Sequence, residues 1–126
     1  MSPHKGMRVS VILFPDVELL DVAGPVEVFS KVDGLEMDFL SSDGEPVTSS
    51  QGLALGVDGD FGTKTGDVLF VPGGAGTRRL VHDAAFLSQV KTMAADSRIL
   101  MSVCTGSALL AAAGLLDGYA ATSNKR

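Results

Sequence analysis

The chain has 126 residues, of which 45% are hydrophobic and 20% charged, which fits one well-cored domain and excludes a disordered protein. Its formal net charge of −5 excludes a general nucleic-acid binder, because no stripe of Lys and Arg is present to neutralise phosphates. A single cysteine cannot form an internal disulfide, and no run of about 18 apolar residues or apolar signal core is present. We therefore expect a cytoplasmic protein that binds neither nucleic acid nor membrane.

The first half of the chain predicts two strands separated by a helix. Apart from Arg8 and Ser10, residues 8–14 are apolar, which is typical of a central strand buried on both faces. The helix follows Leu19 and Leu20, has Pro25 in its first turn and stops at residues 33–34. We expect its apolar face to be formed by Val28, Phe29 and Val32. Residues 35–40 alternate between apolar and polar side chains and predict a half-exposed strand.

The next segment continues the alternation of strands and helices. Residues 47–57 predict short strands broken by glycine, and residues 67–71 predict a second fully buried strand. Asp83 is the expected N-cap of a helix that runs through residue 95. We expect its inner face to be formed by Phe86, Leu87, Val90 and Met93.

Cys104, the only cysteine, follows an apolar run at residues 99–103 and precedes a helical pattern of small residues at 106–113. The thiol is therefore expected on a strand-to-helix turn, at the carboxyl end of a strand and the positive end of a helix. Such a position lowers the pKa of a thiol and favours the reactive thiolate. A lone cysteine is more often a small buried hydrophobe. A buried cysteine does not need a polar, glycine-containing turn, so we predict a nucleophile.

Strands alternating with helices predict an α/β fold, with a mainly parallel sheet covered by helices on both faces. We expect a single domain over residues 1–126. A last strand opens near residue 120 and is cut off, whereas a finished domain normally covers such an edge. We therefore expect the chain to be a truncated part of a longer protein, or to be completed by a second polypeptide.

The active site of such a sheet lies beyond the carboxyl ends of its strands. The loop after the first strand carries Asp16, Glu18 and Asp21. Asp21 lies among apolar residues, and a partly buried carboxyl can hold a proton, donate a hydrogen bond to a thiolate or protonate a substrate. The alternative is that Asp21 only caps the following helix. We expect Asp16 and Glu18 to be solvated.

A second loop, residues 73–76, is rich in glycine, and its backbone N–H groups can point at a developing oxyanion together with the N–H of Thr105. Most such runs are simply turns, and the Gly-Lys of a phosphate-binding loop is absent. Neither His4, near the N-terminus, nor His82, on an expected surface turn, is a clear partner for the thiol. No His, Cys and Asp cluster has the spacing of metal ligands, so we expect neither metal nor cofactor.

Four motifs, in this order, resemble the ThiJ/PfpI superfamily. They are Phe-Pro-Asp followed by LDVAGPVEVF within residues 14–29, VPGGAG at 71–76, SVCTGS at 102–107 and AGLLDGYAAT at 113–122. The pattern is most similar to the branch that holds isonitrile hydratases and the amidotransferase-like domains of AraC-type regulators. The resemblance implies one class I glutamine amidotransferase-like domain, a flavodoxin-like three-layer sandwich that is usually dimeric and whose C-terminal part this chain lacks.

Position by position, the resemblance implies that Cys104 is the nucleophile, that Asp21 hydrogen-bonds it and that Thr105 completes the catalytic site. Gly74 matches the backbone oxyanion donor. Where many members have a histidine this chain has Asn124, which argues against a Cys–His hydrolase. The implied activity is that of a lyase that hydrates an isonitrile, its small-molecule substrate, to an N-substituted formamide. Two alternatives stay open: a cysteine-based oxidation or ligand sensor, and the sensing domain of a transcription regulator.

Overall fold

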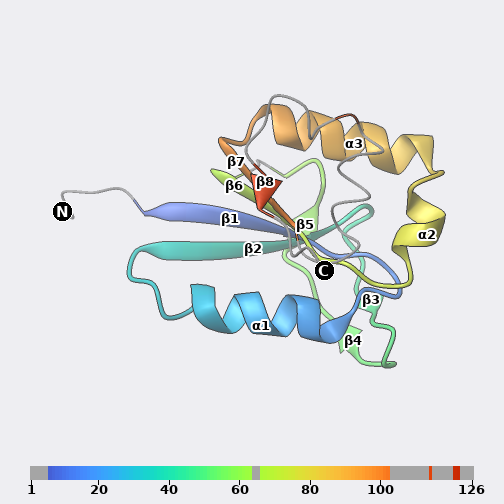
Figure 1. The fold of residues 1–126 in the computed structure, drawn as a ribbon, viewed down its shortest axis with the longest axis horizontal. Coiled ribbons are helices and arrows are strands. Elements are labelled where there is room, and N and C mark those ends of the chain that lie inside the picture. Colours follow the sequence, from blue (N-terminus) through green and yellow to red (C-terminus); the bar gives the residue numbers. More distant parts are fainter. Residues whose placement is uncertain (1–5, 64–65, 103–113, 115–120, 123–126) are drawn as a thin grey trace.

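The computed structural model describes residues 6–63, 66–102, 114 and 121–122, so that Cys104, Thr105 and Asn124 lie outside the described residues. Its centre is a parallel sheet in the order β5-β2-β1-β6-β7-β8 (Figure 1). The strands of this sheet are β1 (Met7–Ile12), β2 (Leu35–Ser41), β5 (Gly59–Asp60), β6 (Val68–Val71), β7 (Ile99–Ser102) and β8 (Ala121–Thr122). An antiparallel hairpin of β3 (Val47–Thr48) and β4 (Ala54–Leu55) stands apart from it.

Helices cover both faces of the sheet, as predicted. Helix α1 (Leu19–Phe29) lies on one face, and α2 (Thr77–Leu80) and α3 (Ala84–Ala95) lie on the other (Figure 1). The chain runs from β1 outward to β2 and later from β6 outward to β7 in the opposite direction, so right-handed crossovers place α1 and α3 on opposite faces. This arrangement is the expected flavodoxin-like sandwich. No helix in the described part of the chain is long and apolar enough to cross a membrane.

The core extends over both faces of the two central strands, β1 and β6. All four residues of β6 are buried, and the last four residues of β1 are buried as well. On the α1 face Phe70 meets Phe29 edge to face, with ring centroids 5.9 Å apart. On the α3 face Phe14 meets Phe86 in the same way at 6.3 Å. The predictions of buried strands at 8–14 and 67–71 are therefore confirmed in type, with β1 ending at Ile12.

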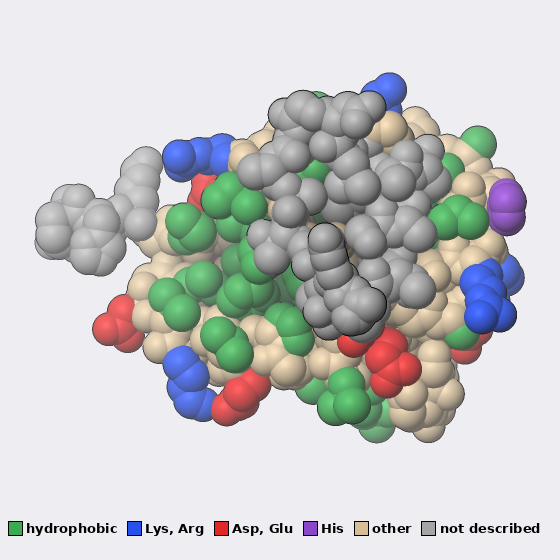
Figure 2. Space-filling model, viewed as in Figure 1, with side chains coloured by type: hydrophobic (Ala, Val, Ile, Leu, Met, Phe, Trp, Pro, Cys, Tyr) green, Lys and Arg blue, Asp and Glu red, His purple; other side chains and the backbone are tan. Residues whose placement is uncertain are grey.

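The predicted apolar face of the first helix was wrong for Val28 and Val32 and right for Phe29. Helix α1 begins at Leu19, so Pro25 lies in its interior and not in its first turn. The face toward the sheet follows the spacing of Val22, Val26 and Phe29, whereas Val28 is 63% exposed because it lies about 100° around the helix from Phe29. Hydrophobic side chains consequently remain visible over α1 and the neighbouring strands (Figure 2). Among the described residues up to residue 34, the exposed large hydrophobic ones are Met7, Leu20, Val28 and Val32.

The later elements agree more closely with expectation. Asp83 is the N-cap of α3, and its carboxylate accepts a hydrogen bond from the N–H of Phe86 at 3.0 Å. Three of the four predicted inner residues of α3 are buried and Leu87 is half-buried. Strand β7 differs at its start, where Ile99 is 42% exposed, because this residue lies at the amino end of the sheet. The β5 strand was not predicted, since only a Gly-Asp pair forms it.

Candidate functional site at the switch point of the sheet

The order of the strands reverses between β1 and β6, which pair in parallel through Val9–Val68 and Val11–Phe70. Their carboxyl ends therefore open onto the same edge of the sheet. In open α/β sheets ligands bind in the crevice at this reversal. The loop that follows β1 and the glycine run that follows β6 lie here, so the structure brings together two of the segments that carry predicted site residues.

The backbone of these two loops is in direct contact. Val17 and Gly74 form an antiparallel bridge, and the N–H of Glu18 donates to the carbonyl of Gly73 at 2.9 Å. Gly74 has φ +140°, and a Cβ added to it would lie 2.5 Å from the nitrogen of Glu18 and 2.6 Å from the oxygen of Asp16. A Cβ on Gly76 would collide with the carbonyl oxygen of Pro15. The glycine run is thus needed for close backbone approach, and its predicted role toward an oxyanion stays a prediction.

Asp16 takes part in this contact, while its side chain remains 47% exposed, in keeping with the solvated position expected for it. It has φ +65°, a left-handed conformation that is uncommon for a residue with a side chain. Its backbone N–H donates to Thr48 at 2.9 Å, and its carbonyl accepts from the hydroxyl of Ser50 at 2.8 Å. Its carboxylate pairs with Arg79 at 3.2 Å. The ion pair and the β3–β4 hairpin together hold the left-handed turn in place.

Gln51, which the sequence reasoning missed, supplies the cap of helix α1. The N-cap residue Glu18 makes no capping hydrogen bond through its own side chain. Instead Oε1 of Gln51 accepts from the N–H of Leu19 at 3.1 Å, and Nε2 of Gln51 donates to both carboxylate oxygens of Glu18 at 3.2 and 3.1 Å. Glu18 is therefore held by an amide partner, in contrast to the solvated position expected for it. The first turn of α1 is fixed by a residue 32 positions further along the chain.

Asp21 lies in that first turn and is half-buried, as predicted. Its N–H donates to the carbonyl of Glu18 at 3.1 Å, and Glu18, not Asp21, is the N-cap. Strand β7 pairs with β6 up to the pair Val71–Ser102, and Ser102 precedes Cys104 by two residues in the sequence. The strand that leads to the predicted nucleophile therefore ends at the edge where Asp21 lies.

The remaining sequence candidates do not add to this group. His82 is exposed on the turn after α2, as expected, and His4 lies outside the described residues. Within the described ranges no three His, Cys, Asp or Glu side chains lie close enough to hold a metal ion. The predicted relation between Asp21 and the thiol of Cys104 stays a prediction, as does the role of Thr105.

Comparisons with known proteins give a consistent picture. The model of the DJ-1/PfpI family matches residues 7–126. Isonitrile hydratase from Pseudomonas putida is 40% identical over 119 residues, which cover 94% of this chain and 52% of that protein. The HTH-type transcriptional regulator GbdR from Pseudomonas aeruginosa is 36% identical over 110 residues, which cover 84% of this chain and 30% of the regulator. The chain thus spans about half the length of the hydratase.

A solved structure of a ThiJ/PfpI family protein from Pseudomonas syringae superposes with a TM-score of 0.84 at 35% identity. The superposition covers 90% of this chain and 48% of that one. The flavodoxin-like arrangement described above is therefore shared with a relative of similar sequence.

The glycine contact predicts different effects for two Gly-to-Ala substitutions. Gly74→Ala should lower the free energy of unfolding by at least about 2 kcal/mol, because its Cβ would collide with backbone atoms at a positive φ. Gly56→Ala, in the exposed segment after β4 with nothing within 4 Å of the added Cβ, should change it by less than about 0.5 kcal/mol. Urea unfolding followed by circular dichroism measures both. A neutral Gly74→Ala variant would contradict the described contact.

The capping role of Gln51 is tested in the same way. Gln51→Ala leaves the first N–H of α1 and the Glu18 carboxylate without their amide partner, and should cost about 1 kcal/mol of unfolding free energy. Gln89→Ala, an exposed glutamine on α3, serves as the matched control and should change the value by less than about 0.5 kcal/mol. Equal losses of unfolding free energy in the two variants would show that Gln51 does not stabilise α1 as a cap.

Proposed function

Because the chain belongs to the DJ-1/PfpI family, we propose that the protein is a cysteine-dependent lyase that hydrates an isonitrile to an N-substituted formamide. The observation that carries this proposal is the 40% identity to isonitrile hydratase over 94% of the chain. Support from the fold comes from Asp21, a half-buried acid at the switch point of the sheet. The activity is proposed for the whole protein, because this chain spans only about half the length of the hydratase.

The proposed reaction begins with attack of the Cys104 thiolate on the electrophilic terminal carbon of the isonitrile. A C–S bond forms, and that carbon takes a proton from the carboxyl of Asp21, which gives a thioimidate. Water then adds to the same carbon; one of its protons goes to the Asp21 carboxylate, the other goes to the nitrogen, and its oxygen becomes the carbonyl of the product. The C–S bond breaks, the thiolate leaves, and the formamide is released. Each turnover consumes one water and restores both residues.

The described residues support the proton-transfer role of Asp21 because they hold the first turn of α1 in a fixed position. The first turn of α1 is held at its N-cap by Gln51 and by the Glu18–Gly73 hydrogen bond, so the backbone of Asp21 is fixed relative to the glycine run. A positioned acid at hydrogen-bond distance contributes about 100-fold or more to a proton-transfer step. The N–H groups of Gly74 and Thr105 are proposed to stabilise the negative charge that develops during attack.

A second candidate function is a sensor. It is favoured by the match to GbdR, in which a stretch similar to 84% of this chain forms only 30% of a transcription regulator. In this reading, Cys104 is oxidised by a peroxide to a sulfenic acid that Asp21 holds by a hydrogen bond, or the same crevice binds an effector without turnover.

Incubation of the full protein with an alkyl isonitrile, with formamide measured by NMR, tests the enzymatic proposal. The unsubstituted protein should form formamide and Cys104→Ala should not. Asp21→Asn should lower kcat by about 100-fold because the proton donor is lost. Glu27→Gln is the control, since Glu27 is an exposed acid on the same helix that pairs with Lys31. It should leave the rate within about twofold, because a solvated ion pair makes little difference to the fold.

Equal rates for the unsubstituted protein and Cys104→Ala would refute the cysteine mechanism. Absence of turnover, together with selective oxidation of Cys104 by mild peroxide in mass spectrometry, would support the sensor in its place.

A further inference from the structure

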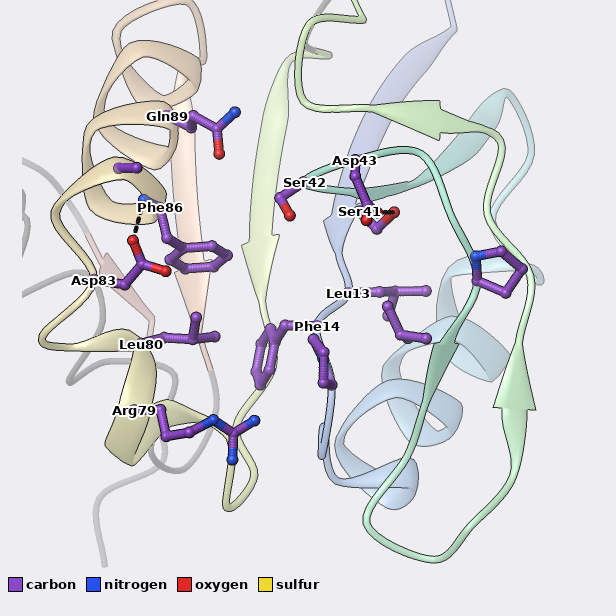
Figure 3. A pocket seen from close by; sticks show the side chains of 14 residues that line it. Leu13, Phe14, Ser41, Ser42, Asp43, Arg79, Leu80, Asp83, Phe86 and Gln89 are labelled. Carbon is purple, nitrogen blue, oxygen red and sulfur yellow. Dashed lines mark hydrogen bonds between the residues drawn. The ribbon is translucent and has the colours of Figure 1, made fainter.

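A pocket of about 380 Å³ lies beside the candidate site, at the carboxyl ends of β1 and β2. One wall is formed by α2 and the start of α3, and the other by residues 41–47 (Figure 3). Neither Asp21 nor the glycine run lines it. Its volume falls in the range of about 300–1,000 Å³ that is typical of small-molecule sites. We propose that this pocket binds a small organic cation, namely a protonated amine carried on an apolar body.

The base of the pocket is apolar and rigid. Leu13 and Phe14 continue from β1 and are almost fully buried, and Phe86 packs against Phe14 edge to face. In Figure 3 Leu13 and Phe14 lie at the base, with Phe86 and Leu80 on the side of the helices. Such a base can cover the hydrocarbon part of a ligand, and removing that part from water favours binding.

The rim places two carboxylates on opposite walls. Asp43 comes from the loop after β2, and Asp83 comes from the N-cap of α3 (Figure 3). Oδ1 of Asp43 accepts from the N–H of Glu45 at 3.0 Å, and Oδ1 of Asp83 accepts from the N–H of Phe86 at 3.0 Å. Among the described hydrogen bonds, Oδ2 of neither residue is used. Each carboxylate is therefore oriented by the backbone and keeps one oxygen for a donor on a ligand.

The charge of the lining favours a cation. Of the described residues that line the pocket, only Arg79 is positively charged, and its guanidinium pairs with the carboxylate of Asp16 at 3.2 Å. The two rim carboxylates are thus left without a compensating charge from the lining. A metal ion fits poorly, because no third acidic or histidine ligand joins them within the described ranges. An ammonium group, with several N–H donors, can bond to the free oxygen of either carboxylate.

Benzylammonium chloride is the probe, titrated into the full protein at neutral pH by calorimetry, with benzyl alcohol as its neutral counterpart. Benzylammonium should bind at least about threefold more tightly than benzyl alcohol, because only the ammonium gains from the exposed carboxylates. Asp43→Asn and Asp83→Asn should each weaken its binding about threefold, and the double variant about tenfold. Asn preserves the accepting oxygen in both places and is as good an N-cap as Asp.

Asp67→Asn is the matched control, since Asp67 also accepts a backbone N–H, from Arg8 at 3.1 Å, but just precedes β6 at the amino end of the sheet. It should leave the affinity unchanged. Amide NMR shifts on titration should centre on Phe86 and Gln89. Three results would each overturn the proposal: equal affinity for benzyl alcohol, unchanged affinity in both pocket variants, or an equal loss in Asp67→Asn. The outcome is independent of whether an isonitrile is turned over.

Discussion

The loop after β1 rests with its backbone directly on the glycine run after β6, and both the candidate site and the neighbouring pocket depend on that contact. Side chains at positions 74 and 76 would prevent it, because a Cβ there would overlap backbone atoms of residues 15–18. The contact fixes Glu18, the N-cap of α1, and with it Asp21 in the first turn. It also fixes Asp16, whose ion pair with Arg79 ties the loop to α2.

The β3–β4 hairpin gives the loop its second support. Thr48 accepts from the N–H of Asp16, Ser50 donates to its carbonyl, and Gln51 caps α1. A residue with a left-handed backbone costs on the order of 1–3 kcal/mol and persists only where its surroundings determine it. The hairpin, which belongs to neither the sheet nor the helices, therefore serves to hold a strained turn at the edge where the chemistry is proposed.

Local patterns in the sequence were sufficient for part of this structure. Continuous apolar runs identified β1 and β6, and an Asp followed by an amphipathic segment identified the N-cap of α3, because burial and capping act over a few residues. The start of α1 was missed, because its cap comes from Gln51, 32 positions further along the chain. The ion pair of Asp16 was missed as well, because its partner Arg79 lies 63 positions away. Such side-chain contacts leave no periodic signal. The half-burial of Asp21 was predicted correctly, while the roles of Cys104, Thr105 and Gly74 remain predictions.

Amide hydrogen exchange of the full protein, followed residue by residue by NMR, tests the contact between the two loops most directly. The N–H groups of Glu18 and Gly76 donate across it, to Gly73 and Asp16. They should exchange as slowly as the N–H of Leu13, which donates to Leu40 at the end of the central sheet. Rapid exchange of the N–H groups of Glu18 and Gly76, at the rate of an open loop while Leu13 stays protected, would show that the contact between the two loops does not position the site.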